Sequence, residues 1–160
     1  PLIHGGGQES GLRSGTENLS AIAGFSKALS LVQKEKQPEN IKLQGLRNYF
    51  LYQIQKRIPN IHLNGHPTER LPNNVHLSFA GVDAERVLSY LDQKGIYASA
   101  GSACTANEIE ISHVLKAMKV PERLARGSMR FSLGKYTTKE DIDNLVKVLI
   151  QIVGSLRKVS

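Results

Sequence analysis

The stretch GSMRFSLGKYTTKEDID, residues 127–143, joins a strand pattern to the start of a helix. Apolar and polar residues alternate over 128–133, which is typical of a strand with one buried face. The apolar members of this alternation are Met129, Phe131 and Leu133. Thr138 and Asp141 then have the spacing of a capping box. The stretch therefore predicts a half-buried strand followed closely by a helix.

The predicted helix carries one apolar stripe, and similar patterns lie upstream. The stripe consists of Ile142, Leu145, Val146, Leu149, Ile152, Val153 and Leu156. A second strand is predicted at 75–79, and Asp83 can cap a helix that Gly95 ends. The shorter predicted elements are strands at 61–63 and 96–100 and a helix capped by Ser112. Together these elements predict an α+β domain, a small sheet covered by helices on one face.

Two helices are expected before the first strand. Apolar residues recur at helical spacing from Thr16 to about Gln37. Pro38 favours the first turn of a helix, so a second helix is predicted from there to Pro59.

Composition limits the classes of function. The chain has 160 residues, of which 40% are hydrophobic, so it can form one domain or one domain with appended helices. Its net charge of +7 is scattered and few aromatics accompany it, which favours solvated helix faces over a nucleic-acid site. The sequence has no apolar run near the roughly 18 residues of a membrane span, so we expect a cytoplasmic protein. Its single cysteine cannot form an internal disulfide.

Two segments could bind anions. Five glycines occur in the first fifteen residues, and the following Thr16 hydroxyl with the nearby charge of Arg13 suits a phosphate. A glycine-rich loop alone is more often only a turn. Arg130 lies between Ser128 and Ser132 on the predicted strand, where a guanidinium can bind a carboxylate bidentately. A solvated arginine on an open sheet face explains this segment equally well.

The cysteine and the histidines leave alternatives open. Cys104 lies among small residues in YASAGSACTANE, which predicts exposure, but a lone thiol is more often inert than reactive. The histidines near the predicted strands are His62, His66 and His76. Their spacing gives only a weak zinc motif, and solvated loop histidines are favoured. His113, in a predicted first helical turn, fits a surface or capping role better than a catalytic one.

Five segments resemble the cysteine desulfurases, enzymes of the aminotransferase class-V group that use pyridoxal phosphate (PLP). The segments are HGGGQESGLRSGTEN (4–18), RLPNNVHLSF (70–79), SAGSACTAN (99–107), SHVLKAM (112–118) and GSMRFSLGKYTTKEDID (127–143). They occur in the family's order and cover nearly the whole chain. The resemblance implies the small C-terminal domain of a fold-type I PLP enzyme, with a mainly antiparallel sheet. Residues 1–37 would end the large PLP-binding domain, and residues 38–160 would form the small domain with a long connecting helix.

The resemblance also implies roles for three residues. Cys104 corresponds to the nucleophile that takes sulfur from L-cysteine as a persulfide and releases alanine. Arg130 corresponds to the arginine that binds the substrate carboxylate. Thr16 corresponds to a residue that reaches the PLP phosphate of the partner subunit, which implies a homodimer. The sulfur would pass to an acceptor or scaffold protein for iron-sulfur clusters or other sulfur-containing cofactors.

The PLP-binding lysine of the family follows a histidine, and no His-Lys pair occurs in these 160 residues. We therefore expect that the chain is the C-terminal part of a longer protein and is inactive alone. A non-catalytic sulfur carrier or interaction module is the alternative, and a nucleic-acid-binding domain is disfavoured by the scattered charge.

Overall fold

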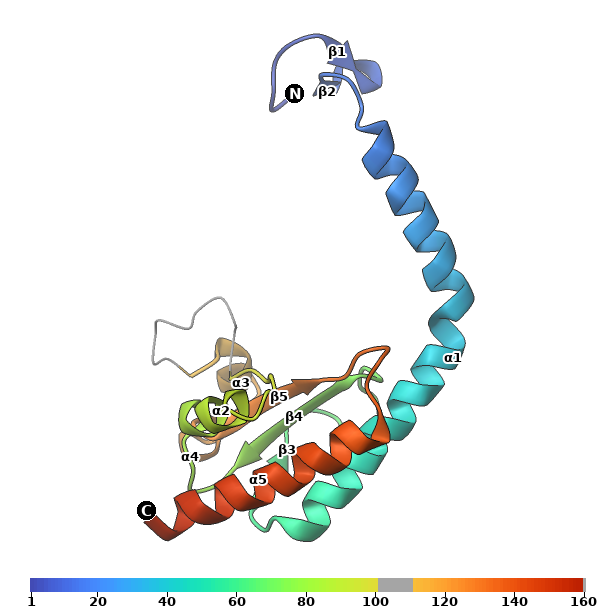
Figure 1. Ribbon diagram of the computed structural model, residues 1–160. Coiled ribbons are helices and arrows are strands. Elements are labelled where there is room, and N and C mark those ends of the chain that lie inside the picture. The colour runs from blue at the N-terminus through green and yellow to red at the C-terminus, as the bar shows by residue number, and fades with distance from the viewer. Residues whose placement is uncertain (101–110, 160) are drawn as a thin grey trace. The chain divides into compact units, whose positions relative to one another are not determined.

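The computed structural model describes residues 1–100 and 111–159. The chain forms two compact units, Pro1–Pro38 and Glu39–Ser160, which are described separately. Helix α1 (Leu19–Arg57) contributes its first half to one unit and its second half to the other (Figure 1).

The first unit begins with a small hairpin in the glycine-rich loop. Strands β1 (Gly7–Gln8) and β2 (Arg13–Ser14) pair antiparallel around the short 3-10 helix η1 (Glu9–Gly11). The sequence analysis did not anticipate this hairpin. The first half of α1 exposes large apolar side chains, namely Leu19, Ile22, Phe25, Leu29, Leu31 and Val32.

The predicted break at Pro38 is wrong, because α1 runs through this residue as one helix. Proline fixes φ at a helical value and removes only one backbone donor. The flanking segment KEKQPENIK holds no glycine, and its Lys, Glu and Gln residues favour helix. The missing bond therefore costs helix stability without ending the helix.

The second unit contains a three-stranded antiparallel sheet in the order β3-β4-β5. Its strands are β3 (Ile61–Leu63), β4 (Asn74–Phe79) and β5 (Ser128–Ser132). Its further helices are α2 (Ala84–Asp92), α3 (His113–Ala117), α4 (Glu122–Ala125) and α5 (Lys139–Val159). The predicted α+β fold with a small antiparallel sheet is confirmed.

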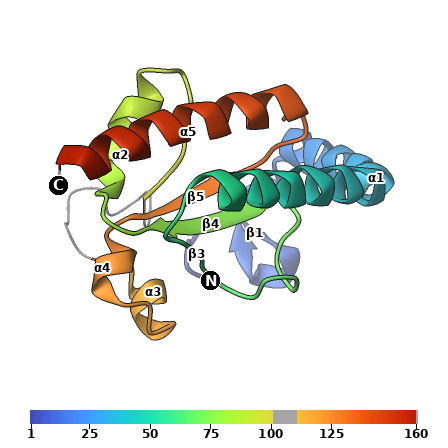
Figure 2. The same ribbon diagram turned by 90° about the horizontal axis from the view of Figure 1, so that it is seen from below.

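One face of the sheet forms the hydrophobic core with α2, α5 and the second half of α1. The buried strand residues of this face are Val75, Leu77, Phe79, Met129 and Phe131, as the alternation predicts. Phe50 of α1 meets Phe131 edge to face, with ring centroids 5.3 Å apart. Figure 2 shows the second half of α1 and α5 on this side of the sheet and the short helices α3 and α4 on the other. Helices therefore lie on both sides, whereas the sequence predicted only one covered face.

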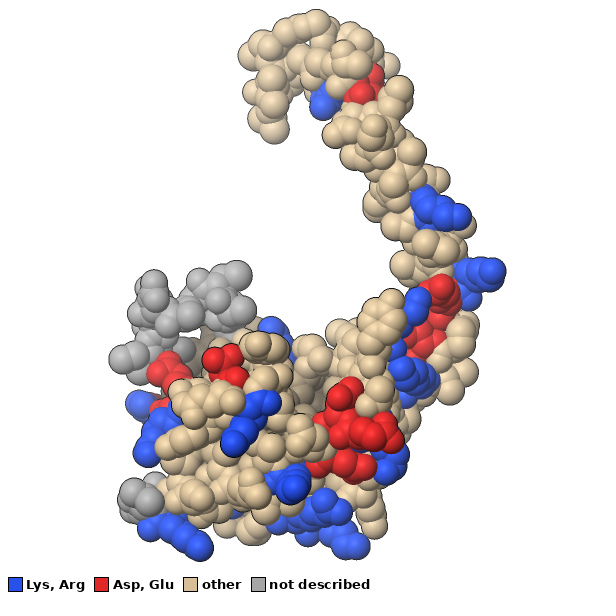
Figure 3. Space-filling view, viewed as in Figure 1, with Lys and Arg blue, Asp and Glu red and all other residues tan. Residues whose placement is uncertain are grey.

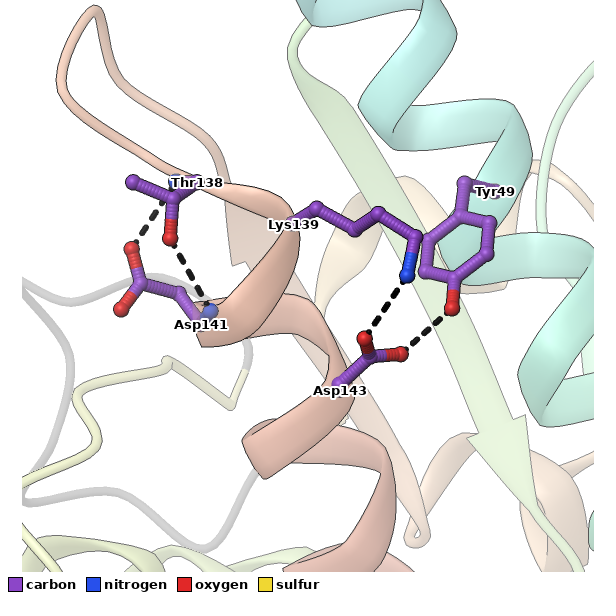
Figure 4. Close-up of polar contacts among 5 residues, drawn as sticks. All are labelled: Tyr49, Thr138, Lys139, Asp141 and Asp143. Atoms are coloured by element: carbon purple, nitrogen blue, oxygen red, sulfur yellow. Dashed lines mark hydrogen bonds and ion pairs between the residues drawn. The ribbon is translucent and has the colours of Figure 1, made fainter.

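The predicted caps of α2 and α5 are confirmed. The Asp83 carboxylate accepts hydrogen bonds from the amides of Glu85 and Arg86. At α5, the Thr138 amide donates to Asp141 Oδ2 and the Asp141 amide donates to Thr138 Oγ1 (Figure 4). Each bond pairs a backbone donor that would otherwise lack a partner at the helix start.

Two other expectations need correction. The predicted strand at 96–100 is reduced to an isolated bridge between Ser99 and Arg130. Ser112 precedes α3, but its side chain makes no capping hydrogen bond. Helix α4 is too short for its periodicity to be recognised in the sequence.

Two features bear on membrane and nucleic-acid binding: the apolar length of the helices and the distribution of surface charge. In the described residues, no helix is both long and apolar enough to cross a bilayer. On the face drawn in Figure 3, basic side chains are interspersed with acidic ones over the second unit and form no continuous basic patch.

Candidate active site

The sheet of the second unit has a polar face opposite its core. Alternation places six residues of β4 and β5 there, namely Asn74, His76, Ser78, Ser128, Arg130 and Ser132. His62 of β3, opposite Ser78, lies on the same face. Four of the six are neutral hydroxyl or amide residues, so Arg130 is the main charge on this face. The predicted separation of Arg130 from the apolar face of β5 is confirmed.

Four residues form a row across this polar face. His76 lies directly opposite Arg130 in the β4–β5 ladder, and Ser99 bridges Arg130 from its other side. The Asn64 amide donates to the His76 carbonyl at 2.9 Å and so continues the β3–β4 pairing by one residue. Side chains opposite one another in such a ladder lie within contact distance. The row therefore brings together Asn64, His76, Arg130 and Ser99.

The row opens into a cavity of about 450 Å³. Its lining residues come from the loop after β3, from β4, β5 and α3, and include Asn64, His66, Glu69, Arg70, His76, Ser112, His113 and Arg130. Among the described residues of this lining there are two arginines and a single carboxylate, a balance that favours an anionic ligand.

Arg130 is half-buried and lines the cavity, where its guanidinium is available to a ligand. Within residues 1–100 and 111–159, Arg126 forms an ion pair with Glu122 and Lys139 with Asp143, and neither pair involves Arg130. A guanidinium on a rigid strand without a carboxylate partner can hold a planar carboxylate through two parallel hydrogen bonds.

His76 is held by Asn64, which is only 4% exposed. The Asn64 Nδ2 atom lies 2.8 Å from His76 Nδ1 and 2.8 Å from Ser78 Oγ. The pKa of His76 is lowered, first by burial and then by the positive charges of Arg130 and Arg70. The imidazole is therefore neutral at pH 7.

Arg70 brings a second guanidinium to the cavity, and backbone carbonyls of the protein accept some of its hydrogen bonds. Its Nη1 and Nη2 atoms donate to the carbonyls of His66 and Asn64 at 3.4 and 3.3 Å. Arg47, from the second half of α1, donates to the Arg70 and Leu71 carbonyls. The pKa of Arg70 is lowered by burial and by the charge of Arg47. Arg70 thus braces the loop after β3 and adds positive charge to the cavity.

The glycine-rich loop in the first unit has features that fit a phosphate group. The side chain of Thr16 is exposed. Arg13 Nη1 donates to the carbonyls of Gly15 and Thr16 at 2.7 and 3.0 Å, which holds a positive charge beside the threonine. Asn18 Oδ1 accepts from the Ala21 amide, so the start of α1 is already partly capped. Thr16 and Arg13 thus place a hydroxyl and a positive charge side by side, a combination that suits an anion such as phosphate.

Cys104 lies outside the described residues. On either side of the undescribed segment, Ala100 and Ile111 are half-buried. His113 is exposed at the start of α3 and lines the cavity, which agrees with a surface position.

The histidines have separate environments. His62 is exposed on β3, and His66 Nδ1 accepts from the Glu69 amide at 2.8 Å and stabilises a turn. Among the described residues, no three potential metal ligands come together. His76 differs because it belongs to the polar row.

Sequence reasoning missed His76 and Arg70 as parts of this site. The alternation that placed Val75 and Leu77 inward also places His76 on the opposite face, so a signal was present. The pairing of His76 with Arg130 depends on the register of two strands about fifty positions apart, which the local pattern does not fix.

Comparisons with known proteins identify the family to which the sequence is similar. The aminotransferase class-V family model matches residues 4–145. Cysteine desulfurase IscS of Dictyoglomus turgidum is 49% identical over 160 residues, covering 100% of this chain and 41% of the relative. Cysteine desulfurase NifS of Azotobacter vinelandii is 41% identical, covering 100% of this chain and 40% of the relative. The chain thus spans about two fifths of the length of these relatives.

Solved structures show the same fold. The X-ray structure of a NifS-like protein from Rickettsia africae ESF-5 superposes with a TM-score of 0.81 at 34% identity, covering 96% of this chain and 40% of that chain. The cysteine desulfurase CsdA from Escherichia coli gives a TM-score of 0.70 at 22% identity over 92% of this chain and 33% of that chain, a likeness of fold alone. The chain belongs to the aminotransferase class-V family, and the relatives from Dictyoglomus turgidum and Azotobacter vinelandii are cysteine desulfurases.

Proposed function

We propose that this chain is part of a PLP-dependent cysteine desulfurase, which converts L-cysteine to L-alanine and carries the removed sulfur on Cys104. The observation that carries the proposal is the half-buried Arg130 guanidinium, which faces a cavity from a polar sheet face without a carboxylate partner in the described ranges. The names of the relatives supply the reaction class.

Arg130 would bind the carboxylate of L-cysteine. Two parallel N–H···O bonds fix both the position and the plane of a carboxylate. β5 is held on both sides, by β4 and by the Ser99 bridge, so the guanidinium starts from a rigid backbone. Substrate held in this way would present its amine and its sulfur in a fixed orientation.

Cys104 would act as the sulfur acceptor. PLP, when bound, withdraws electrons from the substrate carbon that carries the amine. The Cys104 thiolate attacks the substrate sulfur, so that an S–S bond forms and the C–S bond breaks. The electron pair of the broken bond stays with the carbon fragment, which takes up a proton and leaves as alanine. The persulfide on Cys104 then passes its outer sulfur to an acceptor, such as an iron-sulfur scaffold protein.

Thr16 would contact the PLP phosphate of the partner subunit in a cytoplasmic homodimer. Its exposed side chain and the adjacent Arg13 support this assignment. Residues 1–37 would end the large PLP-binding domain and 38–160 would form the small domain. The apolar side chains exposed on the first half of α1 support the packing of that unit against further protein.

The isolated chain would be inactive, since no His-Lys pair supplies the PLP-binding lysine. This feature also favours the second candidate, a sulfur carrier or interaction module that accepts sulfur from elsewhere. The two candidates differ in alanine formation. A longer protein that includes an upstream lysine-bearing segment forms alanine and sulfide from L-cysteine if the desulfurase proposal holds.

Arg130→Lys in that longer protein tests the carboxylate assignment. Lysine keeps the charge but loses the two-pronged geometry, so kcat/KM for L-cysteine should fall on the order of 10- to 100-fold. Arg126→Lys is the matched control, because Arg126 is exposed and pairs only with the neighbouring Glu122 in the described structure. Equal kcat/KM for the two variants would contradict the role of Arg130, and absence of alanine from the unmutated longer protein would favour the sulfur carrier.

A further inference from the structure

His76 and Arg130 form one cross-strand pair at the cavity. They are exact register partners in the antiparallel β4–β5 ladder, and both side chains lie on the polar face. Both residues line the same cavity. A ligand group bound by the Arg130 guanidinium therefore lies within reach of the His76 ring.

The hydrogen bonds of Asn64 set the tautomer of His76. Asn64 Nδ2 carries two hydrogens, and its two neighbours at 2.8 Å are His76 Nδ1 and Ser78 Oγ. Because Nδ2 only donates, Nδ1 is the accepting nitrogen of the ring. The proton of the neutral imidazole therefore lies on Nε2.

The reverse orientation of the Asn64 amide is less favourable. In the present orientation, one buried oxygen, Asn64 Oδ1, has no hydrogen-bond partner within the described part of the chain. Exchange of the two atoms would place an NH₂ group with two unpaired hydrogens at that buried position. A carbonyl oxygen without a donor is the less costly defect, and the nearby Arg70 charge also favours oxygen there.

We infer that His76 is a second carboxylate-binding residue, whose Nε2–H donates to the carboxylate of an α-amino acid held by Arg130. The identity of the ligand as an amino acid rests on the proposed function. A neutral donor suits this position, because it adds a hydrogen bond and direction without placing a further positive charge near the substrate ammonium. Asn64, which also donates to Ser78 Oγ, holds the ring at Nδ1, on the side away from its Nε2.

The tautomer is tested on the unmutated 160-residue chain. Long-range ¹H–¹⁵N NMR spectra of the histidine rings distinguish a protonated Nε2 from a protonated Nδ1. A neutral His76 with the proton on Nε2 at pH 7 supports the inference. A proton on Nδ1, or a charged ring at pH 7, overturns it.

Ligand contact is tested by titration with L-alanine and with L-alaninamide, which lacks the carboxylate. L-alanine should shift the ring signals of His76 and the Nε–H signal of Arg130, and L-alaninamide should shift neither. His76→Leu should weaken L-alanine binding roughly 10-fold or more, as expected for a lost hydrogen bond to a charged group. His76→Gln, which restores an N–H donor, should recover most of the affinity.

His62→Leu is the matched control, because His62 is exposed on the neighbouring strand and outside the row. Unchanged L-alanine affinity in His76→Leu, or shifts at Arg130 without shifts at His76, would overturn the role of His76 and leave that of Arg130 intact. Failure of the proposed function appears separately, as absence of alanine formation in the longer protein. Neither NMR readout depends on that activity.

Discussion

Tyr49 Oη donates a hydrogen bond of 2.5 Å to Asp143 Oδ1 and so joins the second half of α1 to α5 (Figure 4). Lys139 Nζ lies 3.0 Å from Asp143 Oδ2 and 4.6 Å from the centroid of the Tyr49 ring. The pKa of Asp143 is lowered, first by the Tyr49 hydrogen bond and then by Lys139. The three side chains thus link two helices that cover the same face of the sheet.

Tyr49→Phe should raise the pKa of Asp143 and lower the free energy of unfolding at pH 7. A depressed carboxylate pKa stabilises the fold above the ordinary value of 3.8, and this contribution is lost as pH falls through the folded-state pKa. The difference between variant and parent should therefore shrink in acid. Urea unfolding at pH 7 and below pH 3 measures it, with Tyr52→Phe as control because Tyr52 is 60% exposed. If the variant's loss of unfolding free energy is as large below pH 3 as at pH 7, the stabilising role of the Tyr49–Asp143 hydrogen bond is contradicted.

Gly127 is required by close packing at the start of β5. A Cβ at this position would overlap the Phe79 carbonyl oxygen and lie 2.8 Å from the Val82 carbonyl oxygen. The Phe79 amide also donates to the Gly127 carbonyl at 2.9 Å, so the two backbones cannot separate without losing a bond. Gly127→Ala should lower the free energy of unfolding by about 3 kcal/mol. In Gly134→Ala the new methyl meets no atom of the described residues within 4 Å, so equal stability of the two variants would contradict this account.

His76 should titrate below the ordinary histidine value of 6.5. Burial opposes its charge, as do Arg130 on β5 and Arg70 in the loop, and Asn64 occupies Nδ1. Among the described residues, the other ionisable groups that line the cavity are His66, Glu69 and His113. Above pH 6.5 the ring is neutral in both states. As pH falls below 6.5, the unfolded chain takes up a proton first, so stability decreases until the lowered pKa is passed.

Histidine NMR titration gives this pKa directly, and urea unfolding at pH 7 and pH 5 gives its effect on stability. His76→Gln should lose the His76 part of the pH dependence, whereas His62→Gln should keep it. A pKa of 6.5 or higher for His76 would contradict the assigned environment.

Local patterns in the sequence predicted most of the second unit. Alternation identified the buried faces of β4 and β5, because each strand pairs one apolar face with one polar face. The helix caps at Asp83 and Thr138 were found because they need only residues three positions apart or closer. Pro38 was misread since a proline favours a helix start but does not enforce one.

The candidate site was predicted in part, because its residues come from distant segments. Arg130 was identified as a candidate from its own strand and from the resemblance. Its partner His76 was not, since their contact is set by register between β4 and β5. The anchoring of His76 by Asn64 depends on a third strand and could not be inferred from either segment alone.

The most direct test of the central claim is the chemical state of Cys104 after turnover. The longer protein, with its lysine-bearing segment and PLP, is mixed with L-cysteine, and the peptide containing Cys104 is analysed by mass spectrometry without reductant. The account predicts a mass increase of one sulfur atom on Cys104, together with alanine in solution, and neither persulfide nor sulfide transfer in Cys104→Ser. Alanine formation with Cys104 unmodified, or with the sulfur on another residue, would contradict it.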